Sequence, residues 1–446
     1  MTEAARGLAE LIDRPAAADP ERRALVVGDR TTTYGALAAM ARGAAAALVE
    51  AGVRPGWRVA LVDEATEHSI ATLIGAARAG TAAALMNPRL TAPELGALVA
   101  SSGAADVGVA GRRYAPTLVE AGVARVIVAE EIAPVPPGAD APVVPVGPDD
   151  EAAILFTSGT TGLPKAVPMR HGVLGPRVAV FSPTFDAAGT PAVSLMCVPL
   201  VHVGGMLGLL VTLARGDTQV IQHRFDAGEW LELVERHRVE AVFVVPTMLH
   251  RILAHPAFAT TDLSSLRSVT YGAAPAPPEL IRRAMDAMPG ASFSNVFGQT
   301  ETLGSITALA PDDHRTDKVA SVGRPLPGVE VRVVDPVTGE QVPSGAIGEL
   351  WVKTAASVLP EAAPPGPRAP DGWLRTGDLV SIDEDGYLYP AGRMSDTINR
   401  GGEKFAPMEI EAVLREHPAI EDVAVAGVPD AEMAAGSGWR RSSTGP

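Results

Sequence analysis

A loop of glycine and hydroxyl residues follows a short apolar segment and ends in a lysine. The apolar segment is Ile154–Phe156, and the loop runs from Thr157 through Ser158, Gly159, Thr160, Thr161 and Gly162 to Lys165. Glycines let backbone N–H groups turn inward, hydroxyls add donors and one ammonium group adds charge, so the loop can hold a polyphosphate. The order disfavours a P-loop, because Pro164 and Ala166 occupy the places that need Gly and Ser or Thr. The alternative is an ordinary strand-to-helix loop.

Two later segments carry residue types suited to a nucleotide and its metal ion. In the first, Tyr271 precedes small residues that let a flat ring approach the backbone, namely Gly272, Ala273, Ala274 and Pro275. The alternative there is a tight exit from a strand. In the second, Thr300 can hydrogen-bond a phosphate, and Glu301 is a hard oxygen ligand suited to Mg²⁺. The alternative for this pair is two exposed polar side chains that bind nothing.

Composition limits the classes of partner. The chain of 446 residues has 37 Lys and Arg against 52 Asp and Glu, a formal net charge of −15. Hydrophobic residues make up 47% and charged residues 20%, which is typical of a folded protein and not of a disordered chain or coiled coil. The negative charge disfavours general attraction to nucleic acid or an anionic membrane, so we expect neither as a partner.

The cysteine content and the N-terminal sequence bear on location. Cys197 is the single cysteine, which excludes an internal disulfide and a cysteine-based zinc site. Met1–Arg23 lacks the apolar region of a signal peptide, and we therefore expect a cytoplasmic protein. Val193–Ala214 has no charged residue and is long enough to span a membrane. Pro199 and the glycines near its middle favour instead a buried strand followed by a loop.

The elements that position these segments follow an α/β pattern. Strand-like apolar runs alternate with helix-period segments, as in Arg58–Val62 before Glu67–Ala79 and Ala241–Val245 before Thr247–Ala254. This alternation predicts helices and strands layered around largely parallel sheets. We expect the N-terminal domain to cover residues 1–392.

From about Val322 the pattern changes to short strands separated by turns. We expect a small β-barrel-like subdomain over residues 322–392, with strands at Val329–Val334, Gly348–Val352 and Tyr387–Pro390.

A last unit over residues 393–446 is expected to be a partial α+β domain. It has a helix pattern at Pro407–Glu416 and a strand pattern at Val423–Val428. From Ala434 to Pro446 there is neither periodicity nor a strand pattern, so we expect a disordered tail.

These motifs, in this order, resemble the adenylate-forming superfamily of acyl-CoA synthetases, adenylation domains and luciferases. The resemblance extends from about Thr32 to Asp430. It implies a large N-terminal region of two layered αβ sheets with a small β subdomain, followed by an α+β C-terminal domain. It also implies a reaction in which a carboxylic acid is joined to ATP, pyrophosphate is released, and the acyl group passes from AMP to a thiol.

The resemblance assigns roles to residues of these motifs. It implies that Thr157–Lys165 holds the β- and γ-phosphates, that Gly272–Pro275 lies beside adenine and the acyl pocket, and that Glu301 organises Mg²⁺. Asp378, in Gly-Trp-Leu-Arg-Thr-Gly-Asp, would accept both ribose hydroxyls. Arg393 resembles the arginine that contacts ribose and phosphate just before the domain hinge.

His202 matches the histidine that similar synthetases place at the wall of the acyl pocket, and the alternative is a core histidine. Its segment, Pro199–Gly205, contains no aspartate for an ammonium group and no basic residue for a second carboxylate. Gly204 and Gly205, which have no side chains, leave space in the pocket for the acyl group instead. We therefore expect a monocarboxylic, largely apolar acid such as a fatty acid.

The sequence departs from the family near its end. Relatives carry there a lysine that bonds the substrate carboxylate and the α-phosphate, whereas no lysine follows Lys404 in this chain. We expect a truncated C-terminal domain and impaired adenylation, because charge stabilisation is lost where negative charge builds up. The hypothesis for the tail, Gly436–Pro446, is that it is read out of frame.

The expected function is that of an acyl-CoA synthetase that uses ATP, Mg²⁺ and coenzyme A. A second interpretation is a non-catalytic binder of acyl groups or nucleotides. A third is an adenylation domain that loads the thiol of a carrier protein.

Overall fold

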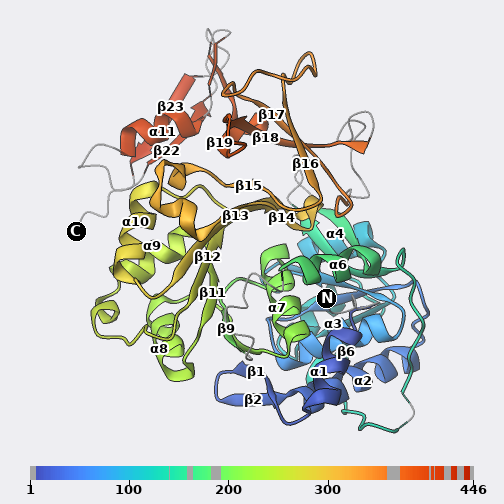
Figure 1. The fold of residues 1–446 in the computed structure, drawn as a ribbon. Helices are drawn as coiled ribbons and strands as arrows, with labels where there is room; N and C mark the ends of the chain where they lie inside the picture. The colour runs from blue at the N-terminus through green and yellow to red at the C-terminus, as the bar shows by residue number, and fades with distance from the viewer. Residues whose placement is uncertain are drawn as a thin grey trace. The chain divides into compact units, whose positions relative to one another are not determined.

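The computed structural model describes most of the chain, which divides into two compact units (Figure 1). The described residues are 7–139, 141–157, 164–181, 192–358, 372–400, 403–405, 407–415, 423–428 and 436–441. The first unit contains Met1–Ile306, Ala310–His314 and Ala355–Ala363, and the second contains Thr307–Leu309, Arg315–Thr354 and Pro364–Pro446. The expected boundary between residues 392 and 393 does not separate these units, because the β-rich segment groups with the end of the chain.

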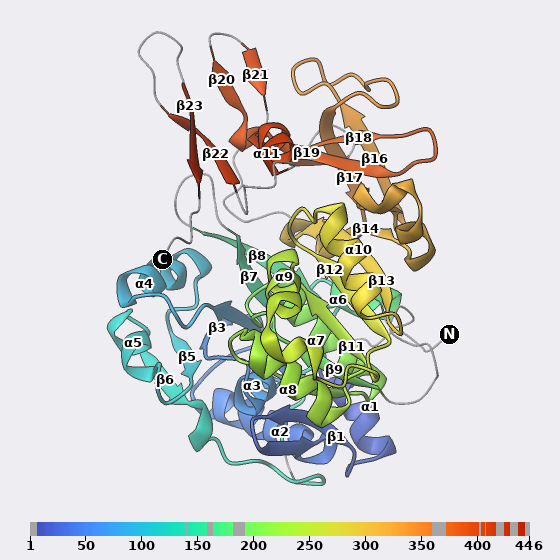
Figure 2. The ribbon, with the colours of Figure 1, turned by 90° about the vertical axis from the view of Figure 1, so that its left-hand side faces the viewer.

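A six-stranded sheet in the first unit has the order β6-β5-β3-β4-β7-β8. Its strands are β3 (Arg58–Val62), β4 (Ala82–Met86), β5 (Val107–Ala110), β6 (Arg125–Val128), β7 (Glu151–Thr157) and β8 (Lys165–Arg170). All neighbouring pairs are parallel except β7 and β8, which form an antiparallel hairpin. The helices that belong with it are α2 (Tyr34–Glu50), α3 (Glu67–Arg78), α4 (Ala92–Ser102) and α5 (Ala115–Glu120). Figure 2 shows α4 and α5 beside β5 and β6.

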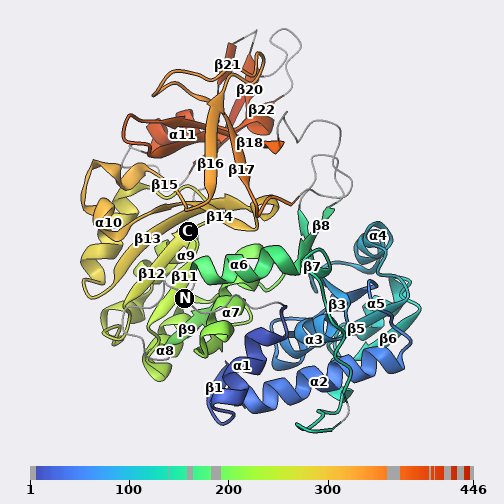
Figure 3. The ribbon, with the colours of Figure 1, turned by 45° about the vertical axis from the view of Figure 1, so that its right-hand side comes forward.

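A nine-stranded sheet has the order β15-β14-β13-β12-β11-β9-β10-β1-β2. Its strands are β1 (Arg23–Val27), β2 (Arg30–Thr33), β9 (Val193–Met196), β10 (Thr218–Ile221), β11 (Ala241–Val244), β12 (Ser268–Gly272), β13 (Ser292–Gln299), β14 (Gly304–Leu309) and β15 (Arg324–Pro325). Its helices are α1 (Glu10–Ala18), α6 (His171–Phe181), α7 (Val203–Arg215), α8 (Ala227–His237), α9 (Pro246–Ala254) and α10 (Pro278–Ala287). Figures 1 and 3 show α8, α9 and α10 on one face and α6 and α7 on the other.

The core of the first unit lies between the two sheets. One hydrophobic cluster joins Leu37 of α2, Leu73 of α3 and Leu210 of α7, all fully buried. A second cluster packs Leu95 and Leu118 onto the far face of the six-stranded sheet. Both faces of that sheet are therefore covered, which explains why its parallel strands are mostly apolar.

The second unit contains a four-stranded antiparallel sheet of order β16-β17-β18-β19. Its strands are β16 (Val329–Val334), β17 (Gly348–Thr354), β18 (Leu374–Ile382) and β19 (Leu388–Arg393). The antiparallel strands agree with the sequence pattern, but β16 and β19 are edges among the described residues, so the sheet is open and not a barrel. The remaining elements are β20 (Ile398–Arg400), β21 (Glu403–Phe405), α11 (Pro407–Arg415), β22 (Val423–Val428) and β23 (Gly436–Arg441).

Two local expectations are wrong. Residues 203–215 form helix α7 and not a loop, because Leu209, Leu210 and Leu213 are fully buried and their packing outweighs the low helix propensity of the glycines. Gly436–Arg441 forms a strand that pairs with β22, although its sequence alternates too weakly to predict one. Backbone hydrogen bonds to the neighbouring strand stabilise this strand although its side-chain pattern is weak. The membrane-span alternative for Val193–Ala214 finds no support in the helices. Among the described residues, no helix is both long enough and apolar enough to cross a bilayer.

Candidate active site

The β7–β8 hairpin holds the two ends of the predicted phosphate loop. Thr157 pairs directly with Lys165 across the antiparallel strands, and both are half-buried. Ile154 and Leu155 are fully buried and anchor the first strand in the core. The loop residues themselves lie outside the described residues, namely Ser158, Gly159, Thr160, Thr161 and Gly162. The two ends of the loop are therefore paired neighbours on antiparallel strands. The loop joins two strands, so it is not a strand-to-helix loop.

The segment after β12 is shaped by a close backbone approach. A Cβ atom on Gly272 would lie 2.2 Å from the carbonyl oxygen of Val296 on β13, so only glycine fits. Ala273 follows with a φ of +65°, an uncommon conformation for alanine. Ala273, Ala274 and Pro275 are exposed, and a ligand can reach them. Strain of this kind is found at ligand-binding sites.

A buried pair supports the same segment. The Tyr271 hydroxyl lies 3.1 Å from Nε2 of His314, and the rings meet edge to face. Nδ1 of His314 is 2.8 Å from the carbonyl oxygen of Ala310, which assigns the proton to Nδ1 and leaves Nε2 to accept from the hydroxyl. Burial raises the pKa of Tyr271 and lowers the pKa of His314. Both groups are therefore neutral and hydrogen-bonded.

Glu301 stands in a tight turn that follows β13. Thr300–Thr302 form one 3-10 turn, and the next two residues, Leu303 and Gly304, have φ values of +49° and +89°. The turn is closed by the Thr302 hydroxyl, which lies 2.7 Å from the carbonyl oxygen of Gly304. Thr300 and Glu301 are half-buried. Among the described residues, the Glu301 carboxylate has no hydrogen-bond or ion-pair partner, so it can accept a ligand.

The side chains around Glu301 suit a magnesium ion that is bound together with ATP. They suit a permanently bound metal ion less well. No group of three or more His, Cys, Asp or Glu residues in the described part of the chain is arranged to hold a metal. Magnesium commonly keeps several waters and takes one or two carboxylates together with substrate phosphates. The single carboxylate of Glu301 suits that mode.

His202 is an exposed residue at the N-terminal end of α7 and not a core histidine. Its N–H donates to the carbonyl oxygen of Pro199 at 3.1 Å. The surrounding protein partly removes the ring from water and lowers its pKa, so the ring is neutral at pH 7. Its exposed ring can contact a bound molecule, and its place at the wall of an acyl pocket stays a prediction.

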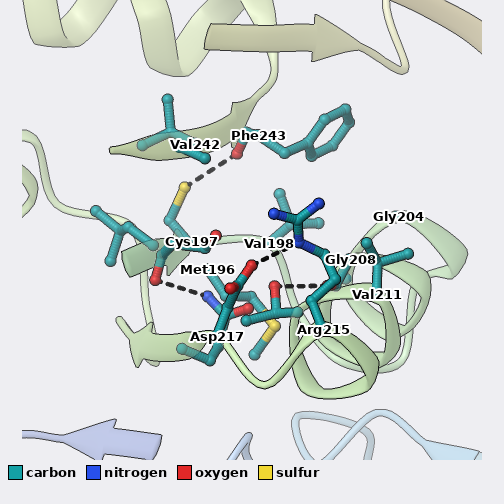
Figure 4. A pocket seen from close by; sticks show the side chains of 16 residues that line it. Met196, Cys197, Val198, Gly204, Gly208, Val211, Arg215, Asp217, Val242 and Phe243 are labelled. Carbon is teal, nitrogen blue, oxygen red and sulfur yellow. Dashed lines mark hydrogen bonds and ion pairs between the residues drawn. The ribbon is translucent and has the colours of Figure 1, made fainter. Parts of the chain in front are cut away.

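A cavity of about 40 Å³ lies between α7 and strands β9, β10 and β11 (Figure 4). Its wall is mainly apolar and includes Gly204, Gly208, Cys197 and Phe243, and burial raises the pKa of Cys197 to about 12. A Cβ atom on Gly208 would meet no atom within 4 Å, which leaves room on this side of the helix. The lining also includes Arg215 and Asp217, whose side chains form an ion pair with an N–O distance of 2.7 Å.

Several of these segments meet at one edge of the nine-stranded sheet. Strands β9, β11, β12 and β13 are parallel, so their carboxyl ends lie together. His202 follows β9, Ala273 follows β12 and Thr300 follows β13. Helix α7 packs close to the residue after the Glu301 turn, because a Cβ atom on Gly304 would lie 3.1 Å from Leu207. In open α/β sheets, ligands bind at this edge.

The second unit holds the remaining predicted residues. Asp378 and Arg393 stand opposite each other on β18 and β19, and Nε of Arg393 donates to Oδ1 of Asp378 at 2.9 Å. Asp378 is buried, whereas the Arg393 side chain is exposed. The structure therefore joins the two residues predicted to contact ribose.

Sequence reasoning missed Arg177, a buried arginine of α6 that binds the backbone of the Glu301 turn. The available signal was a single basic residue among the apolar residues of His171–Phe181.

Comparisons with known proteins identify the family of this chain. The chain matches the family described as AMP-binding enzyme over residues 12–359. It is 35% identical to a feruloyl-CoA synthase from an Amycolatopsis species, over 95% of this chain and 86% of that protein. It is 33% identical to the fatty acid–[acyl-carrier-protein] ligase ScoC from Streptomyces coeruleorubidus, over 92% of this chain and 82% of that protein. Among solved structures, it resembles O-succinylbenzoate coenzyme A synthetase from Bacillus subtilis in complex with ATP and magnesium ion, with a TM-score of 0.83 and 27% identity over 96% of this chain and 88% of that one.

Proposed function

This chain belongs to the AMP-binding enzyme family, among the acyl-CoA synthetases and ligases, and we propose that it activates a largely apolar monocarboxylic acid. In the proposed reaction the acid and ATP give an acyl-adenylate and pyrophosphate, and coenzyme A then takes the acyl group and releases AMP. The observation that supports the proposal is that the segments carrying His202, Ala273 and Thr300 all follow the carboxyl ends of parallel strands in one sheet. A cytoplasmic location stays a prediction.

The first step is an in-line attack of the acid carboxylate on the α-phosphorus of ATP, with pyrophosphate as the leaving group. Little covalent chemistry is needed from the protein, so its contribution is positioning and charge stabilisation. Lys165 at the end of the β7–β8 hairpin would hold the phosphates. Thr300 would donate a hydrogen bond to a phosphate oxygen, and Glu301 would hold the Mg²⁺ that accompanies ATP and neutralises phosphate charge.

The second step breaks the bond between the acyl carbon and AMP. The sulfur of coenzyme A attacks the acyl carbon and its thiol proton passes to water. The thioester forms, and AMP leaves with the electron pair of the broken bond. Asp378 would retain the ribose of AMP through both steps, since an ionised carboxylate accepts hydrogen bonds from two hydroxyls. Ala273, Ala274 and Pro275 are exposed beside β12 and would accept the flat adenine ring.

The proposed acid class follows from the cavity beside α7. Its apolar wall favours an acid without charge at its far end, because a buried unpaired charge would be costly there. The volume of about 40 Å³ exceeds the roughly 10–15 Å³ that one water needs, yet it admits only a slender group. Two relatives are named for the activation of a monocarboxylic acid, the feruloyl-CoA synthase and the fatty acid–[acyl-carrier-protein] ligase, which supports a single carboxylate on the substrate.

The test is pyrophosphate exchange with ATP, Mg²⁺ and a panel of straight-chain, aryl and dicarboxylic acids, followed by thioester formation. We expect exchange with apolar monocarboxylic acids and none with dicarboxylic acids. ATP binding without exchange for any acid would contradict the proposal and support a non-catalytic binder. Parallel reactions with coenzyme A and a phosphopantetheinylated carrier protein identify the acceptor. Impaired adenylation stays a prediction, and the same assay measures it.

A further inference from the structure

Arg177 of α6 is a buried arginine in the first unit, and the proposed reaction gives it no role. The residue is 5% exposed, and its guanidinium carbon lies 4.9 Å from the ring centre of Phe181 one turn further along the helix. Helix α6 begins at His171, directly after strand β8, which starts at Lys165. Arg177 thus belongs to the element that continues from the phosphate hairpin.

The guanidinium group binds the turn that carries Glu301. Its Nε donates to the carbonyl oxygen of Leu303 at 3.3 Å, and its Nη2 donates to the carbonyl oxygen of Ser305. These two carbonyls lie two and four residues after Glu301. A planar guanidinium with donors fixed in a fork can hold two such acceptors in one orientation.

The turn needs this external support because its backbone is uncommon. Leu303 has a φ of +49° although it carries a side chain, and Gly304 has a φ of +89°. A β-carbon on Gly298 would lie 2.1 Å from the carbonyl oxygen of Gly304, so the strand before the turn packs against the residue after it. Non-glycine residues remain in such conformations only when surrounding contacts hold them there.

No carboxylate neutralises Arg177 in the described part of the chain. Burial is the cause of its lowered pKa of about 10, which still leaves the group charged at pH 7. A buried charge without a partner is costly, and a hydrophobic residue would pack here without that cost. The energetic cost of this buried charge indicates that Arg177 has a function beyond packing. Its hydrogen bonds to the Glu301 turn indicate that this function is to hold the turn in place.

We propose that Arg177 is a positioning residue that orients Glu301 for the magnesium ion of ATP by fixing the carbonyls of Leu303 and Ser305. The proposal rests on the proposed function, because it takes Glu301 as the ligand of that ion. Arg177 acts through the turn and not on the substrate. Groups that orient a metal ligand typically change metal affinity or activity by about 10–100-fold when they are removed.

The experiment measures thermal stabilisation by ATP as a function of Mg²⁺ concentration in the full chain. For Arg177→Gln we expect the Mg²⁺ concentration at half-maximal stabilisation to rise by about 10–100-fold, with ATP binding in EDTA unchanged. Arg78→Gln is the matched control, because Arg78 is 7% exposed, lies at the end of α3 and pairs with Asp13 at 2.6 Å. We expect it to lower the melting temperature and leave the Mg²⁺ requirement unchanged.

Two further variants test the same role if Arg177→Gln does not fold well enough to be measured. Gly304→Ala disturbs the same turn from its own backbone, and we expect the same rise in the Mg²⁺ requirement. Arg177→Lys keeps the charge but replaces the fork by a single ammonium, so we expect an intermediate rise. An unchanged Mg²⁺ requirement in Arg177→Gln, or full recovery in Arg177→Lys, would overturn the positioning role. If the unmodified chain shows no stabilisation by ATP, the proposed function itself fails.

Discussion

Arg393 donates a hydrogen bond from Nε to Oδ1 of Asp378 at 2.9 Å, between residues that stand opposite each other on β18 and β19. The pair holds a buried carboxylate beside an exposed guanidinium. Both residues were expected, from the resemblance, to contact the nucleotide. The bond orients the Asp378 carboxylate before any ligand arrives.

Asp378→Ala is therefore expected to weaken ATP binding by about 10–100-fold, because it removes an ionised acceptor whose hydrogen bonds contribute about 1.5–3 kcal/mol. Calorimetry with ATP measures the change. Asp383→Ala is the control, since Asp383 directly follows β18 and accepts hydrogen bonds from Lys318 and Tyr389 at 2.8 and 3.1 Å. It should lower stability without changing ATP affinity, and equal losses in both variants would contradict the ribose role.

Gly208 is expected to set the size of the acid that fits the cavity beside α7. A Cβ atom there meets nothing within 4 Å, so Gly208→Ala should stabilise the protein by roughly 0.5–1 kcal/mol through better helix propensity. Gly208→Leu should reduce kcat/KM by at least about tenfold for the longest acid accepted and leave the shortest unaffected.

Gly290→Leu is the control for the cavity substitution. Gly290 is exposed in a turn, and its nearest neighbour would be a carbonyl oxygen 3.9 Å away. We expect it to leave the preference among acids unchanged. A loss in Gly208→Leu that is equal for all acids would place the acyl chain elsewhere.

His314 is expected to make the protein less stable in mild acid. Its folded-state pKa is lowered by burial from 6.5, so the unfolded chain binds more protons once the pH falls below about 6.5. Stability that is fully present above that pH is therefore lost as the pH decreases towards the folded pKa. His314→Gln should be less stable at pH 7.5 but should lose less on acidification, because it cannot be protonated.

Urea unfolding of both proteins at pH 7.5 and 5.5 measures the difference in slope. Other histidines with lowered pKa values, such as His171, remain in both proteins and cancel in the comparison. Parallel pH dependence in the two proteins would contradict the buried neutral state of His314.

Asp63 is expected to make the protein less stable as the pH rises, which is the opposite of the effect of His314. Burial raises its pKa from 3.8 to about 6, so the folded protein binds the extra proton between these values and stability falls as the pH rises through them. Asp63→Asn should therefore stabilise the protein at pH 7 by about 1–3 kcal/mol, with the gain vanishing near pH 4. Urea unfolding at both pH values checks this, and a gain that persists at pH 4 would exclude a charge effect.

Much of the fold was predictable where side-chain pattern and local chemistry agree. Val329–Val334 and Arg58–Val62 are strands with the expected bounds, because their apolar residues face a core. The helix that starts at Glu67 begins with a capping box formed by Thr66 and Ser69, a signal carried by residues three positions apart. The order of the motifs along the chain likewise indicates the family without any tertiary structure.

What only the tertiary structure decided depends on contacts outside the local sequence pattern. The pairing of Thr157 with Lys165, the left-handed backbone at Ala273 and the strand at Gly436–Arg441 depend on neighbours that no local pattern specifies. Arg177 is the clearest case. Its type and position in an apolar helix were visible in the sequence, but its bonds to a turn more than a hundred residues away follow from the packing of α6 beside that turn. Local patterns determine which residues are buried, whereas long-range packing determines which of them meet.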